Sequence, residues 1–236
     1  MGSYYLAIDI GASSGRHILG HVENGRMLLE EIHRFENRQI RRDGHDCWDV
    51  QHLWQGILDG LKVCKTLGKI PVSVGIDTWA VDFVLLGESG DRISDAVAYR
   101  DGRTDGVDCL VEAKISAEEL YAHTGIQKQS FNTIYQLVAL QQEHPEQLRA
   151  AHSLLMIPDY FNYLLTGVKK QEYTNATSTG LVNATTKEWD RELLERLGLS
   201  DHLFATLSLP GETVGSLRPD IAEAVGFQTT VVLPAT

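Results

Sequence analysis

A carboxylate, a run of small residues and a cation follow one another near the N-terminus. Asp9 stands close to the end of a short apolar run, residues 4–10, and Arg16 follows five small residues. These five are Gly11, Ala12, Ser13, Ser14 and Gly15. Small residues let backbone N–H groups approach an anion, a carboxylate can hold Mg²⁺ or its water, and an arginine offsets negative charge. The pattern predicts a metal–phosphate site, and an ordinary hairpin with an aspartate in its turn is the alternative.

The surroundings of this stretch exclude two common phosphate-binding loops. It contains no Gly-Lys-Ser/Thr, and it lacks the third glycine of a dinucleotide-binding fingerprint. Residues 17–22 are another β-like run, so we expect a strand, not a helix, after the turn. Asn24-Gly25 is a strong hairpin signal and predicts a third strand at 27–35, antiparallel to the second.

A second group of polar residues surrounds the end of another predicted strand. Asp77, Trp79 and Asp82 lie just past its apolar residues, where α/β proteins usually bind ligands. Trp79 could stack on the apolar face of a sugar and Asp82 could accept hydroxyl hydrogen bonds. A core tryptophan beside two turn caps is the alternative. Arg100 and Asp101 follow a further short apolar run and are expected to order the same pocket, although an exposed loop pair would read the same way.

The expected elements place both groups in one domain. A helix at 50–64 has Asp49 as its cap and ends at Gly68. The other expected elements are a polar loop at 38–47, strands at 71–78 and 83–86, a mostly helical excursion at 104–166, a helix at 190–197 and an extended run to 236. Residues 174–179, rich in hydroxyls, fit a polyol site, a solvated turn or the cap of a short helix. The order strand, strand, strand, helix, strand predicts an α/β actin-like ATPase (ribonuclease H-like) domain. Its mixed sheet would have three leading antiparallel strands, flanking helices and a helical insertion.

Composition limits the possible partners. The 236 residues suit one large or two small domains, and 43% hydrophobic residues are ample for a core. A net charge of −11 argues against a nucleic-acid surface. No apolar run reaches the roughly 18 residues of a membrane span, and no signal peptide is apparent. The three cysteines share no metal-ligand spacing, so we expect reduced thiols and a cytoplasmic protein.

Several segments, taken in order, resemble the FGGY carbohydrate kinases. They are residues 9–16, 31–35, 75–86, 98–101, 156–161 and 172–177. The resemblance runs from about Tyr4 to the last residue and implies ATP and Mg²⁺ as cofactors. It assigns Asp9 to the metal, residues 11–16 to the ATP phosphates and the position after Trp79, here Ala80, to the sugar. That position is usually glycine in the relatives that act on L-rhamnulose, so the added methyl group bears on substrate specificity.

The resemblance also implies that residues 1–236 are the first of two lobes. The family's catalytic aspartate would then lie just after Thr236, the second lobe would be absent, and this chain alone would be inactive. The implied reaction transfers the γ-phosphoryl group of ATP to the 1-hydroxyl of L-rhamnulose or a similar ketose. A kinase for another ketose or polyol, or a non-catalytic sugar-binding lobe, are the alternatives.

Overall fold

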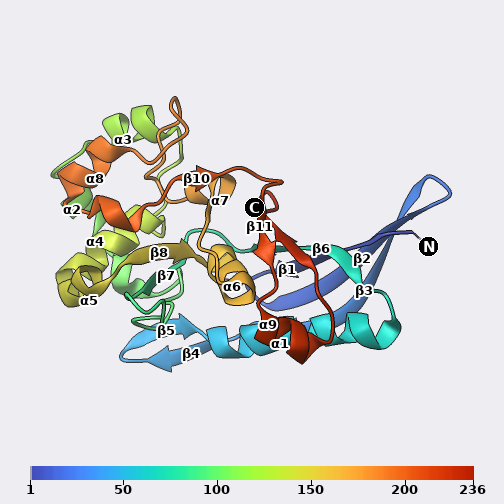
Figure 1. The fold of residues 1–236 in the computed structure, drawn as a ribbon. Coiled ribbons are helices and arrows are strands. Elements are labelled where there is room, and N and C mark those ends of the chain that lie inside the picture. The colour runs from blue at the N-terminus through green and yellow to red at the C-terminus, as the bar shows by residue number, and fades with distance from the viewer. Residues whose placement is uncertain (1) are drawn as a thin grey trace.

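A six-stranded mixed sheet forms one part of the fold, to the right in Figure 1, in a computed structural model that describes residues 2–236. The strands, in their order across the sheet, are β11 (Thr213–Ser216), β12 (Thr230–Val232), β6 (Pro71–Thr78), β1 (Tyr4–Ile10), β2 (Ser14–Glu23) and β3 (Arg26–Glu36). β1, β2 and β3 pair antiparallel, whereas β6 runs parallel to both β1 and β12. The predicted mixed sheet with three leading antiparallel strands is confirmed.

The turn between β2 and β3 is formed by Asn24 and Gly25. Both residues have positive φ, 50° and 73°, and such a pair matches the right-handed twist of a two-residue hairpin. The predicted hairpin is therefore confirmed. The expected strand after the small-residue turn is also confirmed, because β2 begins at Ser14.

The polar loop expected at 38–47 is wrong. β4 (Gln39–Arg42) and β5 (His45–Trp48) pair antiparallel there as a second hairpin. Its turn is Asp43-Gly44, again with positive φ at both residues, and Asp-Gly is a hairpin signal in its own right. The charged residues around the turn favoured the prediction of a loop. Two of them, Arg41 and Asp46, form an ion pair of 2.8 Å across the two strands.

Helix α1 (Val50–Leu67) packs against the sheet with a glycine, Gly60, beside the ring of His17. The Asp49 side chain accepts a hydrogen bond from the backbone N–H of His52, and the helix ends at Gly68 as predicted. A Cβ atom at Gly60 would lie 2.3 Å from the ring of His17 on β2, so only glycine fits at this crossing. The helix therefore approaches β2 more closely than a side chain at Gly60 would allow.

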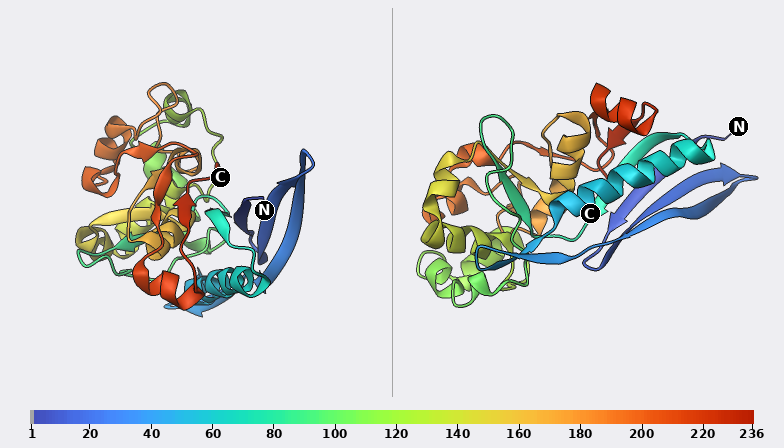
Figure 2. Two further views of the ribbon diagram at one scale, coloured as in Figure 1. Left: turned by 45° about the vertical axis from the view of Figure 1, so that its right-hand side comes forward. Right: turned by 90° about the horizontal axis from the view of Figure 1, so that it is seen from below.

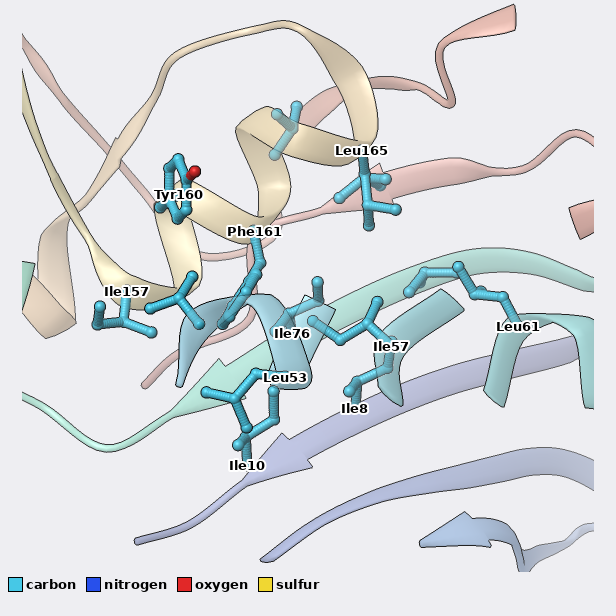
Figure 3. Packing of buried hydrophobic residues seen from close by; sticks show 14 of the residues in the cluster. Ile8, Ile10, Leu53, Ile57, Leu61, Ile76, Ile157, Tyr160, Phe161 and Leu165 are labelled. Atoms are coloured by element: carbon cyan, nitrogen blue, oxygen red, sulfur yellow. The ribbon is translucent and has the colours of Figure 1, made fainter. Parts of the chain in front are cut away.

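One face of the sheet is covered by α1, α6 (Ile157–Thr166) and α9 (Pro219–Val225), as Figure 2 shows from two further sides. Figure 3 shows how side chains from the sheet and from α1 and α6 meet in this core. The labelled residues are Ile8, Ile10, Leu53, Ile57, Leu61, Ile76, Ile157, Tyr160, Phe161 and Leu165. Side chains on the opposite face are partly exposed, for example Tyr5 at 49%. The charged residues described below belong to this second face.

A second hydrophobic core joins the remaining helices to a small two-stranded antiparallel sheet of β7 (Phe83–Leu86) and β8 (Ser153–Met156). Its helices are α2 (Asp108–Glu112), α3 (Ala117–Thr124), α4 (Thr133–Glu143), α5 (Pro145–Ala150), α7 (Tyr173–Thr177) and α8 (Arg191–Leu197). Two short 3₁₀ helices, Gly102–Thr104 and Asp201–Leu203, and the strands β9 (Gln171–Glu172) and β10 (Leu207–Ser208) complete the chain. Residues up to Phe204 pack into this core, beyond the expected helical range of 104–166.

The extended run expected at the C-terminal end is partly wrong, because α9 interrupts it. Pro219 stands in the first turn of this helix, and Ile221 and Val225 point into the first core. Its seven residues are too few for a clear helical period in the sequence, so the helix depends on packing against the sheet. Within residues 2–236, no helix is both long and apolar enough to cross a bilayer.

Candidate functional site

Four charged side chains form a row across four neighbouring strands at one end of the sheet. Asp77 on β6 is the parallel partner of Asp9 on β1, Asp9 faces Arg16 on β2, and Arg16 faces Arg34 on β3. Partners in register project from the same face of a sheet. The Asp9 Oδ2 and Arg16 Nε atoms are 3.3 Å apart, and the two side chains remain 43% and 39% exposed. Two carboxylates and two guanidinium groups thus form one strip on this face of the sheet.

Asp77 is the least solvated member of this row. Burial raises the pKa of its carboxyl group, and the negative charges of Asp9 and Glu172 raise it further, whereas a hydrogen bond from the backbone of Thr78 opposes the rise. Among the described residues, no group donates a hydrogen bond to its buried Oδ1 atom. Two neighbouring carboxylates with a free buried oxygen are a donor set that suits a hard divalent cation. The residues present therefore fit Mg²⁺.

The loop between β1 and β2 lies beside this row and is held by an asparagine that the sequence reasoning missed. Asn37 donates from Nδ2 to the carbonyl oxygen of Gly11 (2.8 Å) and from its backbone N–H to Ser13 O (3.0 Å). Within residues 2–236, the N–H groups of Ala12 and Ser13 donate no hydrogen bond, so both are free for an anion. Asn37 stands two residues after the strand predicted at 27–35, and this position was the signal available in the sequence.

The two glycines of the loop have different physical roles. A Cβ atom at Gly15 would lie 2.2 Å from the ring of Phe35, whereas one at Gly11 would meet nothing closer than 3.8 Å. The small side chain at Gly15 is therefore required by packing within the sheet, and not by the approach of an anion. Gly11 tolerates a Cβ atom sterically.

A buried carboxylate organises the aromatic side chains at the end of β6. Asp82 is fully buried, and its Oδ2 atom accepts hydrogen bonds from Trp48 Nε1 (2.6 Å), Trp79 Nε1 (2.9 Å) and the backbone N–H of Tyr99 (3.0 Å). The rings of Trp48 and Trp79 are 4.2 Å apart. Asp82 thus lies behind the indoles and fixes their planes, and its direct contact with a sugar stays a prediction. Trp48 was not among the candidate residues.

Ala80 and Val81 form a tight turn between the two groups. Ala80 is half-buried, and its carbonyl oxygen accepts a hydrogen bond from the N–H of Asp82 (2.9 Å). Val81, the central residue, has a φ of 68°. A positive φ is rare for a β-branched residue, and residues held in this way concentrate at functional sites.

Arg100 and Asp101 lie next to this aromatic group. Together with residues such as Tyr99 and Phe131 they line a depression of about 580 Å³. The Arg100 guanidinium is exposed and stands over the ring of Tyr99 at 5.2 Å. The carboxylate of Asp101 is nearly buried and accepts hydrogen bonds from His45 Nδ1 and from the backbone N–H groups of residues 46 and 103. Asp101 thus stabilises the local fold, and its contact with a sugar stays a prediction.

The hydroxyl-rich residues 174–179 mostly bond to their own helical turn. The hydroxyl groups of Thr177, Ser178 and Thr179 each donate to the backbone carbonyl oxygen three residues earlier, within α7. Glu172, which is buried, accepts hydrogen bonds from the N–H groups of residues 174 and 175 and thus caps the helix. Of the alternatives left open by the sequence, the short capped helix is what the structure shows.

Comparison with known proteins agrees with the geometry. The N-terminal domain of the FGGY family of carbohydrate kinases matches residues 4–235. A rhamnulokinase from Oceanobacillus iheyensis is 53% identical over 98% of this chain and 49% of its own length. One from Halalkalibacterium halodurans is 55% identical over 99% of this chain and 50% of its own length. The chain therefore spans about half the length of the curated relatives it matches.

Solved structures show the same fold. The crystal structure of a gluconate kinase from Lactobacillus acidophilus superimposes on the whole chain with a TM-score of 0.87 at 19% identity, covering 48% of that protein. A ligand-bound xylulose kinase from the same organism gives a TM-score of 0.87 at 19% identity over 99% of this chain and 48% of its own. At these identities the likeness establishes the α/β actin-like fold.

Proposed function

The chain belongs to the FGGY family of carbohydrate kinases, and on that basis we propose that it forms the N-terminal half of an ATP-dependent kinase for L-rhamnulose or a similar ketose. The observation that carries the proposal is the charged row of Asp77, Asp9 and Arg16 beside a loop with free N–H groups. The relatives named rhamnulokinase, more than half identical over nearly the whole chain, support L-rhamnulose as the substrate.

The residues of this chain would bind the phosphate end of the nucleotide. Asp9, with Asp77 beside it, would hold Mg²⁺, which when bound neutralises charge that develops on the transferred phosphoryl group. The free N–H groups of Ala12 and Ser13 donate toward phosphate oxygens, and Arg16 adds a positive charge beside Asp9. Such binding depends on positioning and charge stabilisation, and both are provided by a rigid sheet end.

The aromatic group would place the sugar. The indole of Trp79 is held by Asp82 and offers a flat apolar surface, and the half-buried Ala80 is its neighbour in the chain. Contacts at Ala80 would set the fit of the ketose, because one methyl group in a pocket is worth about 1–3 kcal/mol.

The proposed reaction transfers the γ-phosphoryl group of ATP to the 1-hydroxyl group, and ADP leaves. A base must receive the hydroxyl proton, and we assign this role to the second half of such kinases. General-base catalysis contributes about 10²–10⁴-fold, so residues 1–236 alone should show no measurable phosphorylation.

The test is an assay of ADP formation with the full-length protein that carries this chain, against L-rhamnulose and a panel of ketoses and polyols. Phosphorylation of L-rhamnulose at the highest kcat/KM is the expected result. A higher kcat/KM for another sugar would replace L-rhamnulose by that substrate. Sugar binding in calorimetry without any ADP formation would favour a non-catalytic lobe and overturn the kinase proposal. Turnover by residues 1–236 alone would refute the assignment of the base.

A further inference from the structure

The turn at Val81 is held from both sides by the helical part of the chain. Its carbonyl oxygen accepts hydrogen bonds from Thr133 Oγ1 (2.6 Å) and Gln136 Nε2 (3.3 Å), both on α4. Its N–H donates to Ser178 Oγ (3.2 Å). A turn closed over two residues around a positive φ is rare and strained, and it persists only where its surroundings hold it. The hydrogen bonds of Val81 with Thr133, Gln136 and Ser178, called the clamp below, therefore hold the strained turn in place.

Gln136 is the centre of that clamp. It is 1% exposed, and its Nε2 atom also approaches Asp82 Oδ1 at 2.9 Å and Phe131 O at 2.9 Å. Its Oε1 atom accepts a hydrogen bond from Arg103 Nη2 (2.6 Å). Since a guanidinium group only donates, it fixes the orientation of the amide, and Nε2 must face Val81 and Asp82.

The chain of contacts continues to the face of the site. Gln136 holds Asp82 through one carboxylate oxygen, and the other carboxylate oxygen holds the Trp79 indole at 2.9 Å. Two of the partners of Gln136, Val81 and Asp82, belong to the short segment 79–82 that carries the indole. A displacement of this amide would change the backbone at Val81 and the carboxylate at Asp82 together.

We propose that Gln136 is a positioning residue that fixes the plane of Trp79, and thereby the affinity for the sugar, without touching the sugar itself. The part concerning the sugar rests on the proposed function. The part concerning Trp79 is independent of it and can be tested by spectroscopy alone.

A matched control exists in the same chain. Gln171 is also 1% exposed and donates from Nε2 to two backbone carbonyl oxygens (2.6 and 3.1 Å). Its Oε1 atom accepts a hydrogen bond from Trp189 Nε1 (3.2 Å), which also donates to Ala205 O (2.8 Å). It has no hydrogen bond to residues 79–82. Q136L and Q171L therefore remove the same chemical group from two buried networks, only one of which contains Trp79.

The first experiment measures hydrogen exchange of the indole N–H groups by NMR in ¹⁵N-labelled full-length protein. We expect Q136L to speed exchange at Trp79 at least about tenfold with little change at Trp189. Q171L should leave exchange at Trp79 unchanged and speed it at Trp189 by a smaller factor, because the bond from Trp189 Nε1 to Ala205 O remains. T133V, which removes only the hydroxyl bond to Val81, should speed exchange at Trp79 by a smaller factor. If Q136L does not fold, T133V decides alone. Unchanged Trp79 exchange in the folded variants, or equal loosening of Trp79 by Q171L, would overturn the proposal.

The second experiment measures KM for sugar and for ATP together with kcat. We expect Q136L to raise the sugar KM at least about tenfold with the ATP KM unchanged, whereas Q171L alters neither. An equal rise of both KM values in Q136L would indicate general loosening and contradict the proposal. If the wild-type protein phosphorylates no sugar, the proposed function fails, and the indole exchange still decides the role of Gln136.

Discussion

The indole of Trp79 donates a 2.9 Å hydrogen bond to Oδ2 of Asp82, a carboxylate without any contact with solvent. Burial raises the pKa of Asp82, and the hydrogen bonds from Trp48, Gln136 and Trp79 act against that rise. The sequence predicts that Asp82 accepts hydrogen bonds from sugar hydroxyl groups, and that contact stays a prediction. The structure shows that Asp82 accepts hydrogen bonds from the indoles of Trp48 and Trp79 and so aligns these aromatic residues.

Asp82→Asn should destabilise the fold by about 2–4 kcal/mol. Both carboxylate oxygens accept hydrogen bonds, so an amide must turn its NH₂ group toward either Gln136 or the indoles. The free energy of unfolding in urea measures the effect. Asp59→Asn on α1, where the side chain is 45% exposed, is the control and should change it by less than about 0.5 kcal/mol. An Asp82→Asn protein as stable as the wild type would refute the buried-acceptor role.

Gly60→Ala should also destabilise the protein, by about 1–3 kcal/mol, although alanine is the better helix former. The new Cβ atom would overlap the His17 ring, at 2.3 Å. The loss should be smaller in a His17→Ala background, where the ring is gone, and a double-mutant cycle measures this coupling. Additive effects would show that the close approach of α1 to β2 does not depend on this contact.

The pH dependence of stability should depend strongly on His17. Burial and the neighbouring His33 lower the pKa of His17 to about 4, although a hydrogen bond to Ile57 O opposes the shift. The unfolded chain, with a histidine pKa near 6.5, binds the proton first, so stability falls as the pH falls from about 6.5 toward 4. The loss between pH 7.5 and 5 should be about 2 kcal/mol. Urea unfolding at both pH values measures it, and His17→Leu should abolish that part of the slope. An equal slope in His17→Leu would contradict the prediction.

Asp9→Asn should lower kcat of the full-length protein at least about 100-fold and leave its stability nearly unchanged. The exposed ion pair with Arg16 contributes little, and the substitution also removes a charge that repels Asp77. Steady-state kinetics at several Mg²⁺ concentrations, with thermal unfolding alongside, test both parts. Full activity of the Asp9→Asn protein would contradict the assignment of Asp9 as a ligand of Mg²⁺.

Asn37→Ala should raise the KM for ATP severalfold and leave the KM for the sugar unchanged. The substitution removes the bond that holds Gly11 O at 2.8 Å, so the loop with the free N–H groups loses its fixed position. Gln55→Ala, at an exposed hydrogen bond on α1, should change neither KM. A rise in the sugar KM alone would show that the loop serves the other substrate.

Local patterns in the sequence were sufficient for most of the fold. Asn24-Gly25 specified the first hairpin and Asp49 the start of α1, because each satisfies backbone geometry or hydrogen bonds of its immediate neighbours. Asp43-Gly44 specifies the second hairpin in the same way, through positive φ at both residues, although the residues around it are polar and charged. Helix α9 is different, since it is stabilised by the packing of its apolar residues against the sheet and not by a local sequence pattern.

The candidate site divides in the same way. Asp9, Asp77, Trp79 and the small-residue loop were accessible from sequence. Polar residues at or just past the carboxyl end of a buried strand lie at one end of the sheet, wherever that strand is placed in it. The roles of Trp48, Gln136 and Asn37 were decided only by tertiary structure. Their partners lie 34, 54 and 26 positions away in the chain. Donor and acceptor come within hydrogen-bonding distance only because the β4–β5 hairpin, α4 and the end of β3 pack around the ends of β1 and β6.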